Sequence, residues 1–335
     1  MNKKLKIIVS VLLILILGLI ILTAFNYKNQ NKKKSVKFNY INDSITINLY
    51  NLSENKVEDT FRKIKEIYKK YDKLIDKENS YEGINNLYYI IYNDSKSDNI
   101  KIDKDLYKML KEGKNWYQKS DGLIDISMGS VLDIWKMYRD STTGIPTIFE
   151  LERAHSATID DIVLLENNKI KNNRVSIDLD DIAKGYATKE VIDYLKVNKI
   201  NEYLINIGES TITGNHYDNG KYKIAIKDLT NDEYKILHAN NISIINTNIN
   251  QNYYDYNNKH YHDLISPKTL MPANYFKGVT IITDDIKDSF VISKLLFLMP
   301  IDEGKKYVEE QNNLEAIWYI DEDKIEKSNG FSKYE

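Results

Sequence analysis

The chain has 335 residues, 42% hydrophobic and 29% charged, which is enough to bury a substantial core in one large domain or two. Its 47 basic and 49 acidic residues give a formal net charge of -2, so no overall positive field favours nucleic acid as a partner. Cysteine is absent, which excludes disulfides, thiol nucleophiles and zinc–thiolate sites and leaves only oxygen or imidazole as ligands for a metal.

The N-terminus is predicted to be a membrane anchor, over residues 1–25. Three lysines precede an uncharged, mostly aliphatic run over residues 7–24, close to the ~20 apolar residues that a spanning helix needs. No small-x-small cleavage pattern follows, so we expect an anchor, with a cleaved signal peptide as the alternative. A polar tether, residues 26–36, comes next. Its lysines argue against export of the body by the positive-inside rule, so the residue pattern alone leaves the topology open.

The body, residues 37–335, begins with alternating patterns that predict two strands, over residues 37–40 and 44–50. Apolar residues at helical spacing predict a packing helix over residues 57–75 and a second helix from Asp103 to Ser120. Asp121 and Gly122 follow as the turn that ends the second helix, because glycine readily takes the left-handed conformation. A further helix is expected over residues 147–155.

The run from Leu123 to Val131 is apolar except for one carboxylate, two serine hydroxyl groups and one glycine. The carboxylate, Asp125, has two interpretations: it caps a helix, or it belongs to a functional site. The residue pattern favours the cap.

The stretch from Val175 to Ala187 predicts a short strand, a tight acidic turn and a helix that opens with Lys184 and Gly185. Backbone N–H groups at a helix start, together with a lysine, favour an anionic ligand. This stretch is therefore the candidate phosphate site.

The C-terminal part alternates predicted strands with two helices, so the body is predicted to be α+β. The strands are expected over residues 202–210, 222–226, 242–245, 279–283 and 315–320, and the helices over residues 285–298 and 303–310. His260, His262 and Asp263 suggest either a metal site or a polar loop, and the lack of an acidic partner at helical spacing favours the loop. Walker, Rossmann and Gly-x-Ser-x-Gly motifs are absent, and the sequence has no repeat of fixed period.

Four motifs together resemble the FAD:protein FMN transferase (ApbE) family, in its order and spacing, over roughly residues 38–331. They are Ser120-Asp121-Gly122-x-x-Asp125-x-Ser127-x-Gly129, then Asp178-Leu179-x-x-Ile182-Ala183-Lys184-Gly185-Tyr186-Ala187, then Asn206-Ile207-Gly208, then Pro267-Lys268-Thr269 followed by Pro272.

The resemblance implies a two-lobed α+β body related to the tandem T-fold, tethered outside the cytoplasmic membrane. It also implies that the chain binds FAD and uses Mg²⁺ to polarise the pyrophosphate. FMN then moves to a threonine or serine hydroxyl of a partner flavoprotein, and AMP is released.

By position, the family's contacts with FAD fall on six residues of this chain: Leu123, Ile124, Asp125, Asp178, Lys184 and Ile265. Asp178 and Lys184 are also the predicted catalytic residues. The backbone carbonyl of Asp181 is expected to face Mg²⁺.

The metal motif differs from the family pattern. An Asp and a Thr four residues later normally ligate the metal, and Phe290 and Lys294 stand there, without a carboxylate or a hydroxyl. Asp288 lies two residues away, about 200° around a helix, so it replaces the ligand only if the register shifts. Alternatively, the Lys294 ammonium takes the place of the ion on phosphate. The sequence thus predicts a working transferase or, alternatively, an inactive flavin-binding or structural module of a membrane complex.

Overall fold

The computed structural model describes residue 12 and residues 15–21, 33–92, 99–227, 233–321 and 324–335. Most of the predicted anchor and tether therefore lies outside the described residues, and the described part of the anchor is helical. Among the described residues, no helix has the length and apolar character needed to cross a membrane. The first strand begins at Lys34, inside the predicted tether.

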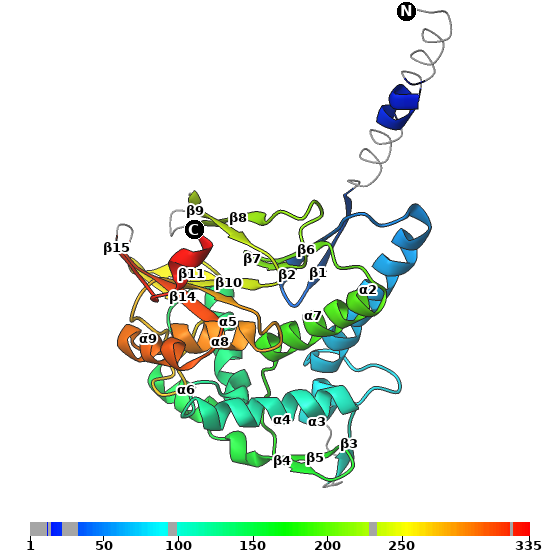
Figure 1. Ribbon diagram of the computed structural model, residues 1–335. Helices are drawn as coiled ribbons and strands as arrows, with labels where there is room; N and C mark the ends of the chain where they lie inside the picture. The colour runs from blue at the N-terminus through cyan, green and yellow to red at the C-terminus, as the bar shows by residue number, and fades with distance from the viewer. Residues whose placement is uncertain (1–11, 13–14, 22–32, 93–98, 228–232, 322–323) are drawn as a thin grey trace, which may run out of the picture.

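An eight-stranded antiparallel sheet forms the upper layer of the molecule (Figure 1). In spatial order its strands are β1 (Lys34–Tyr40), β2 (Asp43–Leu49), β6 (Tyr203–Ile207), β7 (Ser210–Thr213), β10 (Ser243–Asn248), β13 (Gly278–Thr283), β14 (Leu314–Asp321) and β15 (Lys324–Lys327). The helices listed next lie beneath one face of it: α2 (Glu54–Ile75), α7 (Asp180–Val197), α8 (Ser289–Phe297) and α9 (Ile301–Glu310).

Both faces of the sheet are covered, and the central strand β13 reflects this in its composition. Ile281 packs in the main core with the helices, whereas Ile282 packs on the opposite face with Ile224 and Leu237. The latter two belong to a hairpin of β8 (Tyr222–Lys227) and β9 (Glu233–Ala239). All six residues of β13 are accordingly buried, as expected for a strand that is covered on both faces.

The sheet consists of two halves with the same order of elements: two strands, two helices, two strands. The first half is β1, β2, α2, α7, β6 and β7, and the second is β10, β13, α8, α9, β14 and β15. In each half the helices connect the two middle strands, which pair antiparallel as β2 with β6 and β13 with β14. Residues 76–179 are inserted between α2 and α7 of the first half only, so the repeated order has no fixed sequence period.

The inserted segment forms most of a lower lobe, on the side of the helices away from the sheet (Figure 1). Its elements are α3 (Leu87–Tyr92), β3 (Ile100–Lys101), α4 (Lys104–Lys119), the 3₁₀ turn η1 (Ile126–Met128), α5 (Gly129–Ser141), α6 (Ile148–Ala154), the 3₁₀ turn η2 (Ile159–Asp161), β4 (Ile162–Leu165) and β5 (Lys169–Asn172). Outside the insertion, β11 (Tyr253–Tyr256) pairs with β12 (Lys259–His262), and the 3₁₀ turn η3 (Phe331–Tyr334) ends the chain.

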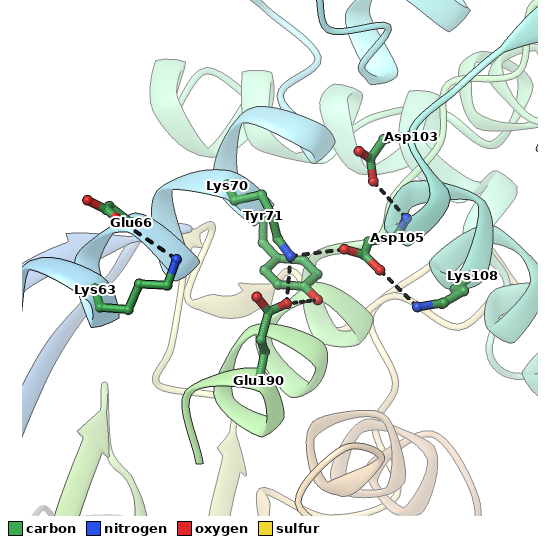
Figure 2. A network of polar contacts seen from close by, with 8 residues as sticks. All are labelled: Lys63, Glu66, Lys70, Tyr71, Asp103, Asp105, Lys108 and Glu190. Atoms are coloured by element: carbon green, nitrogen blue, oxygen red, sulfur yellow. Dashed lines mark hydrogen bonds and ion pairs between the residues drawn. The ribbon is translucent and has the colours of Figure 1, made fainter. Parts of the chain in front are cut away.

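Figure 2 shows the polar network that attaches the lower lobe to the helix layer. Lys70 of α2 donates to Asp105 of α4 at 2.9 Å and to Glu190 of α7 at 2.6 Å. The Tyr71 hydroxyl donates to the same Glu190 oxygen at 2.8 Å. Three helices far apart in the sequence are thus tied at one point.

The α+β class is confirmed, and so are the early strands and the helices α2, α4 and α6. Asp103 caps α4, and Gly122, at φ +78°, takes the left-handed turn after it. Two expectations were wrong. Residues 175–178 form no strand, and α8 begins at Ser289 instead of residue 285.

Candidate functional site

A pocket lies between the lower lobe and the helix layer. One part of its lining is apolar: Leu123, Ile124, Ile126, Met128, Leu132, Leu179, Ile182, Ile265, Pro267 and Val291. The other part is charged: Asp125, Asp178, Asp180, Asp181 and Lys294. An apolar cavity with a few convergent polar groups is the usual form of a small-molecule site.

Close backbone packing brings the two acidic segments together. The Gly129 N–H donates to the Ser176 carbonyl at 3.0 Å, and the Asp178 N–H donates to the Ile126 carbonyl at 2.8 Å. A Cβ at Gly129 would lie 2.4 Å from the Ser176 oxygen, so only glycine allows this approach. Residues 175–178 therefore bond to the η1 turn and the start of α5, which is why the predicted strand does not form.

A second glycine sets the distance between α7 and α8. A Cβ at Gly185 would lie 1.8 Å from the Lys287 carbonyl oxygen, in the segment that leads into α8. This contact lets the first turn of α7 lie beside α8, which places Asp181 opposite Lys294.

Among the described residues that line the pocket, Lys294 is the only lysine or arginine. Its Nζ lies 3.0 Å from Asp181 Oδ2 and 3.8 Å from Asp178 Oδ2. Burial acts to lower the pKa of Lys294, but Asp181 and Asp178 outweigh it and hold this pKa above its ordinary value. The ammonium is therefore charged at neutral pH, and its side chain is 24% exposed toward the pocket.

The carboxylates of the first turn of α7 differ in charge state. Burial raises the pKa of Asp180 to about 7, and the neighbouring Asp178 carboxylate adds to this rise. Burial also acts to raise the pKa of Asp181, but Lys294 outweighs it and lowers this pKa below its ordinary value. Asp181 is therefore ionised at neutral pH, whereas Asp180 keeps its proton at pH values where an ordinary aspartate has lost it.

Asp125 lines the pocket and also caps a helix. Its Oδ1 accepts from the Ser127 N–H at 2.8 Å and from the Ser127 hydroxyl at 2.6 Å, which closes the η1 turn. Its Oδ2 lies 3.5 Å from His155 Nε2. The prediction that Asp125 caps a helix is therefore confirmed. Because Asp125 also lines the pocket, a role in ligand binding stays a prediction.

Five of the six predicted FAD contacts line the pocket: Leu123, Ile124, Asp125, Asp178 and Ile265. The sixth, Lys184, does not. Its Nζ is paired with Asp43 Oδ2 at 2.6 Å, and although burial acts to lower the pKa of Lys184, Asp43 raises it above the ordinary value. The partner comes from the start of β2, so sequence spacing gave no sign of it.

Only one of the two predicted metal residues lines the pocket. Asp181 lines the pocket, whereas Asp288 lies outside its lining and is paired with Lys287 at 3.3 Å. In the described part of the chain, no three His, Cys, Asp or Glu side chains are grouped so as to hold a metal ion. The Lys294 ammonium lies where a cation between Asp178 and Asp181 would be. These residues do not fit Mg²⁺, and we assign no step to it.

The two histidines of β12 have structural partners. His262 Nε2 lies 3.0 Å from the Ala273 carbonyl, and burial lowers the pKa of this histidine to about 4. His260 lies 2.9 Å from Asp255 and 2.8 Å from the Ile249 carbonyl. These contacts give both histidines structural roles, but the segment is a strand paired with β11, so the predicted polar loop was wrong.

Asp180, Met128, Leu132 and Val291 line the pocket but were not predicted as site residues. Asp180 had a signal, because it lies in the acidic turn of the candidate phosphate site. The three apolar residues had none, since they look like core residues in the sequence.

Comparisons with known proteins bear on the family and the fold. The model of the ApbE family matches residues 42–318. The chain is similar to a FAD:protein FMN transferase of Klebsiella pneumoniae (21% identity; 65% of this chain and 70% of the relative). It is also similar to one of Haemophilus influenzae (26% identity; 69% of each chain). Its fold is similar to the crystal structure of the ApbE protein of Thermotoga maritima, with a TM-score of 0.79 at 20% identity over 91% of this chain and 99% of the other.

Proposed function

The chain belongs to the ApbE family, and we propose that it is an FAD:protein FMN transferase that moves FMN from FAD to a threonine or serine hydroxyl of a partner flavoprotein. The observation that carries this proposal is the pocket, in which an apolar wall lies next to a charged helix start. The relatives that carry the name FAD:protein FMN transferase favour it over an inactive flavin-binding module.

The two parts of the pocket suit two parts of FAD, the flavin ring and the pyrophosphate. Leu123, Ile124 and Ile265 offer an apolar surface to the flavin ring, which is large and flat. The pyrophosphate belongs at the start of α7, where the first N–H groups of a helix have no carbonyl partner within the helix. Lys294 adds the positive charge that an anion needs beside Asp178 and Asp181.

The reaction requires one bond to form and one to break. The hydroxyl oxygen of the acceptor attacks the flavin-side phosphorus, and the bond from this phosphorus to the bridging oxygen breaks. AMP leaves with the bridging oxygen, and the hydroxyl proton passes to a base. Asp180 lines the pocket with a pKa of about 7, which suits a general base near neutral pH.

The test is flavin transfer by the purified full-length chain. It is incubated with FAD and an acceptor domain that has a threonine flavinylation site, and the acceptor is weighed by mass spectrometry. The expected result is a mass gain of one FMN, absent when the acceptor threonine is replaced by valine. FAD binding without any mass gain would favour the inactive flavin-binding module instead.

The N-terminal segment extends the proposal to location. Residues 1–25 anchor the chain in the cell membrane in a single pass, a tether from residue 26 leads to β1 at Lys34, and the body from β1 onward lies outside the cytoplasm. Two points support this: the apolar run over residues 7–24 is close to the length of a spanning helix, and the family that the motifs resemble is usually exported. Protease treatment of intact cells tests this, since protection of the body would place it in the cytoplasm.

A further inference from the structure

The charged part of the pocket needs a cation before it can hold a pyrophosphate. Asp125, Asp178, Asp180 and Asp181 all line it, and each ionised carboxylate repels an anionic ligand. Helix N–H groups carry only partial positive charge, so they do not balance several carboxylates. A full positive charge is required between the acids and the ligand.

Lys294 is positioned to supply this charge. Its Nζ lies within 4 Å of both Asp181 and Asp178, on a helix that packs against the helix bearing Asp181. An ammonium has three N–H donors. Asp181, at 3.0 Å, takes at most one, and Asp178, at 3.8 Å, lies beyond hydrogen-bond range. The geometry thus leaves donors for a ligand in the pocket.

The same position excludes a divalent ion. Mg²⁺ requires oxygen ligands at about 2.1 Å, so an ion bound to Asp181 and Asp178 would lie against the ammonium. Like charges at such a distance repel strongly in a partly buried site. Phe290, one turn before Lys294, is 7% exposed and packs in the main core, so it adds no ligand.

We propose that the Lys294 ammonium is the resident cation at the pyrophosphate, so that this chain binds FAD and transfers FMN without a divalent metal. The inference rests on the proposed function for the transfer step but not for FAD binding. It names a residue, on α8, as the counterpart of a metal ion.

The first test compares the full-length protein with and without a chelator. FAD affinity is measured by the change in flavin fluorescence, transfer by acceptor mass, and metal binding by the electron paramagnetic resonance signal of Mn²⁺. We expect affinity and transfer to change less than twofold in EDTA, and no stoichiometric Mn²⁺ binding. Loss of FAD binding in EDTA that Mg²⁺ reverses would overturn the inference.

The second test removes the cation. Lys294→Ala should weaken FAD binding at least tenfold, and added ethylammonium should restore part of it by filling the vacated space with the same charge. Lys287→Ala is the matched control, since Lys287 lies outside the pocket lining and pairs with Glu112 and Asp288. Unchanged FAD affinity in Lys294→Ala would overturn the inference.

The two proposals fail in different ways. Metal-independent FAD binding that depends on Lys294, without transfer under any condition, would overturn the proposed transferase and support the cation role. Transfer that requires Mg²⁺ would support the transferase and overturn the cation role.

Discussion

Two lysines of this protein, Lys70 and Lys294, each lie beside two carboxylates, and each contacts helix α7. Lys70 contacts Glu190 in the second half of α7, and Lys294 contacts Asp181 in its first turn. They differ in how many of their three N–H donors bond a carboxylate. Lys70 bonds both carboxylates within 2.9 Å, and Tyr71 bonds the same Glu190 oxygen (Figure 2).

Lys294 has one carboxylate at bonding distance and one beyond it, and it borders a pocket. Lys70 is not among the residues that line this pocket. A lysine that bonds two carboxylates on different helices joins those helices, whereas a lysine that bonds one carboxylate beside a cavity keeps more donors for a ligand. The number of carboxylates near a lysine therefore does not distinguish the two roles, but the number that it bonds does.

The largest effect is expected for Lys294→Met, which keeps the length of the side chain and removes its charge. FMN transfer should fall about 100-fold, or about 2.7 kcal/mol, because the charge at the reacting phosphorus is lost. Initial rates of acceptor flavinylation measure this. Rates within threefold of wild type would mean that Lys294, like Lys70, is structural.

The second largest effect is expected for Gly185→Ala, because the added methyl group pushes α7 away from α8. The added Cβ meets the Lys287 carbonyl, and overpacking of this kind costs about 1–3 kcal/mol of unfolding free energy. Urea denaturation followed by circular dichroism measures the loss. Gly144→Ala is the control, since its nearest neighbour would be an ordinary contact at 3.6 Å. Equal stability of the two variants would contradict the close approach.

Lys70→Met tests whether Lys70 acts only by joining α2, α4 and α7. The side chain of Lys70 is 36% exposed, so we expect a loss of only about 0.5–1 kcal/mol in unfolding free energy. FAD affinity should stay within twofold of wild type, because Lys70 is not among the residues that line the pocket. A tenfold loss of FAD affinity at unchanged fold would show that the two ends of α7 are coupled.

The smallest effect concerns pH. The pKa of Asp180 is raised to about 7 in the folded protein, above its ordinary value of 3.8. The folded state therefore keeps a proton that the unfolded chain releases, and the resulting stability, full below about pH 4, is lost as pH rises through about 7. Ionised Asp180 also repels the pyrophosphate, so the dissociation constant of FAD should rise about threefold from pH 6 to 8. Titrations of Asp180→Asn should be flat, and a parallel slope in both proteins would exclude Asp180 as the cause.

The sequence predicted the elements that depend on local patterns. The amphipathic helices α2 and α4 follow from apolar spacing, and the end of α4 follows from Gly122. Residues 175–178 look like a strand because they alternate, but their partner is the η1 turn and the start of α5, which no local pattern reveals. Helix α5 was not predicted, because its first residue, Gly129, is not a residue that marks a helix start.

The site was predicted in part for the same reason. The motifs located the acidic turn and the apolar contacts, which lie close together in sequence. They could not locate partners from distant segments. Lys184 matches the family position, yet Asp43, from the start of β2, holds its ammonium outside the pocket lining. The Lys294–Asp181 pair likewise joins residues from the two halves of the sheet.

This division has a consequence for the order of synthesis. Asp178 lies near the end of the inserted segment and Asp181 in the first turn of α7, whereas Lys294 lies on α8 of the second half. As the ribosome makes the chain from its N-terminus, the acids emerge more than a hundred residues before their counter-charge. A chain arrested before α8 therefore contains the acids of the pocket without Lys294, the cation that we propose for the pyrophosphate.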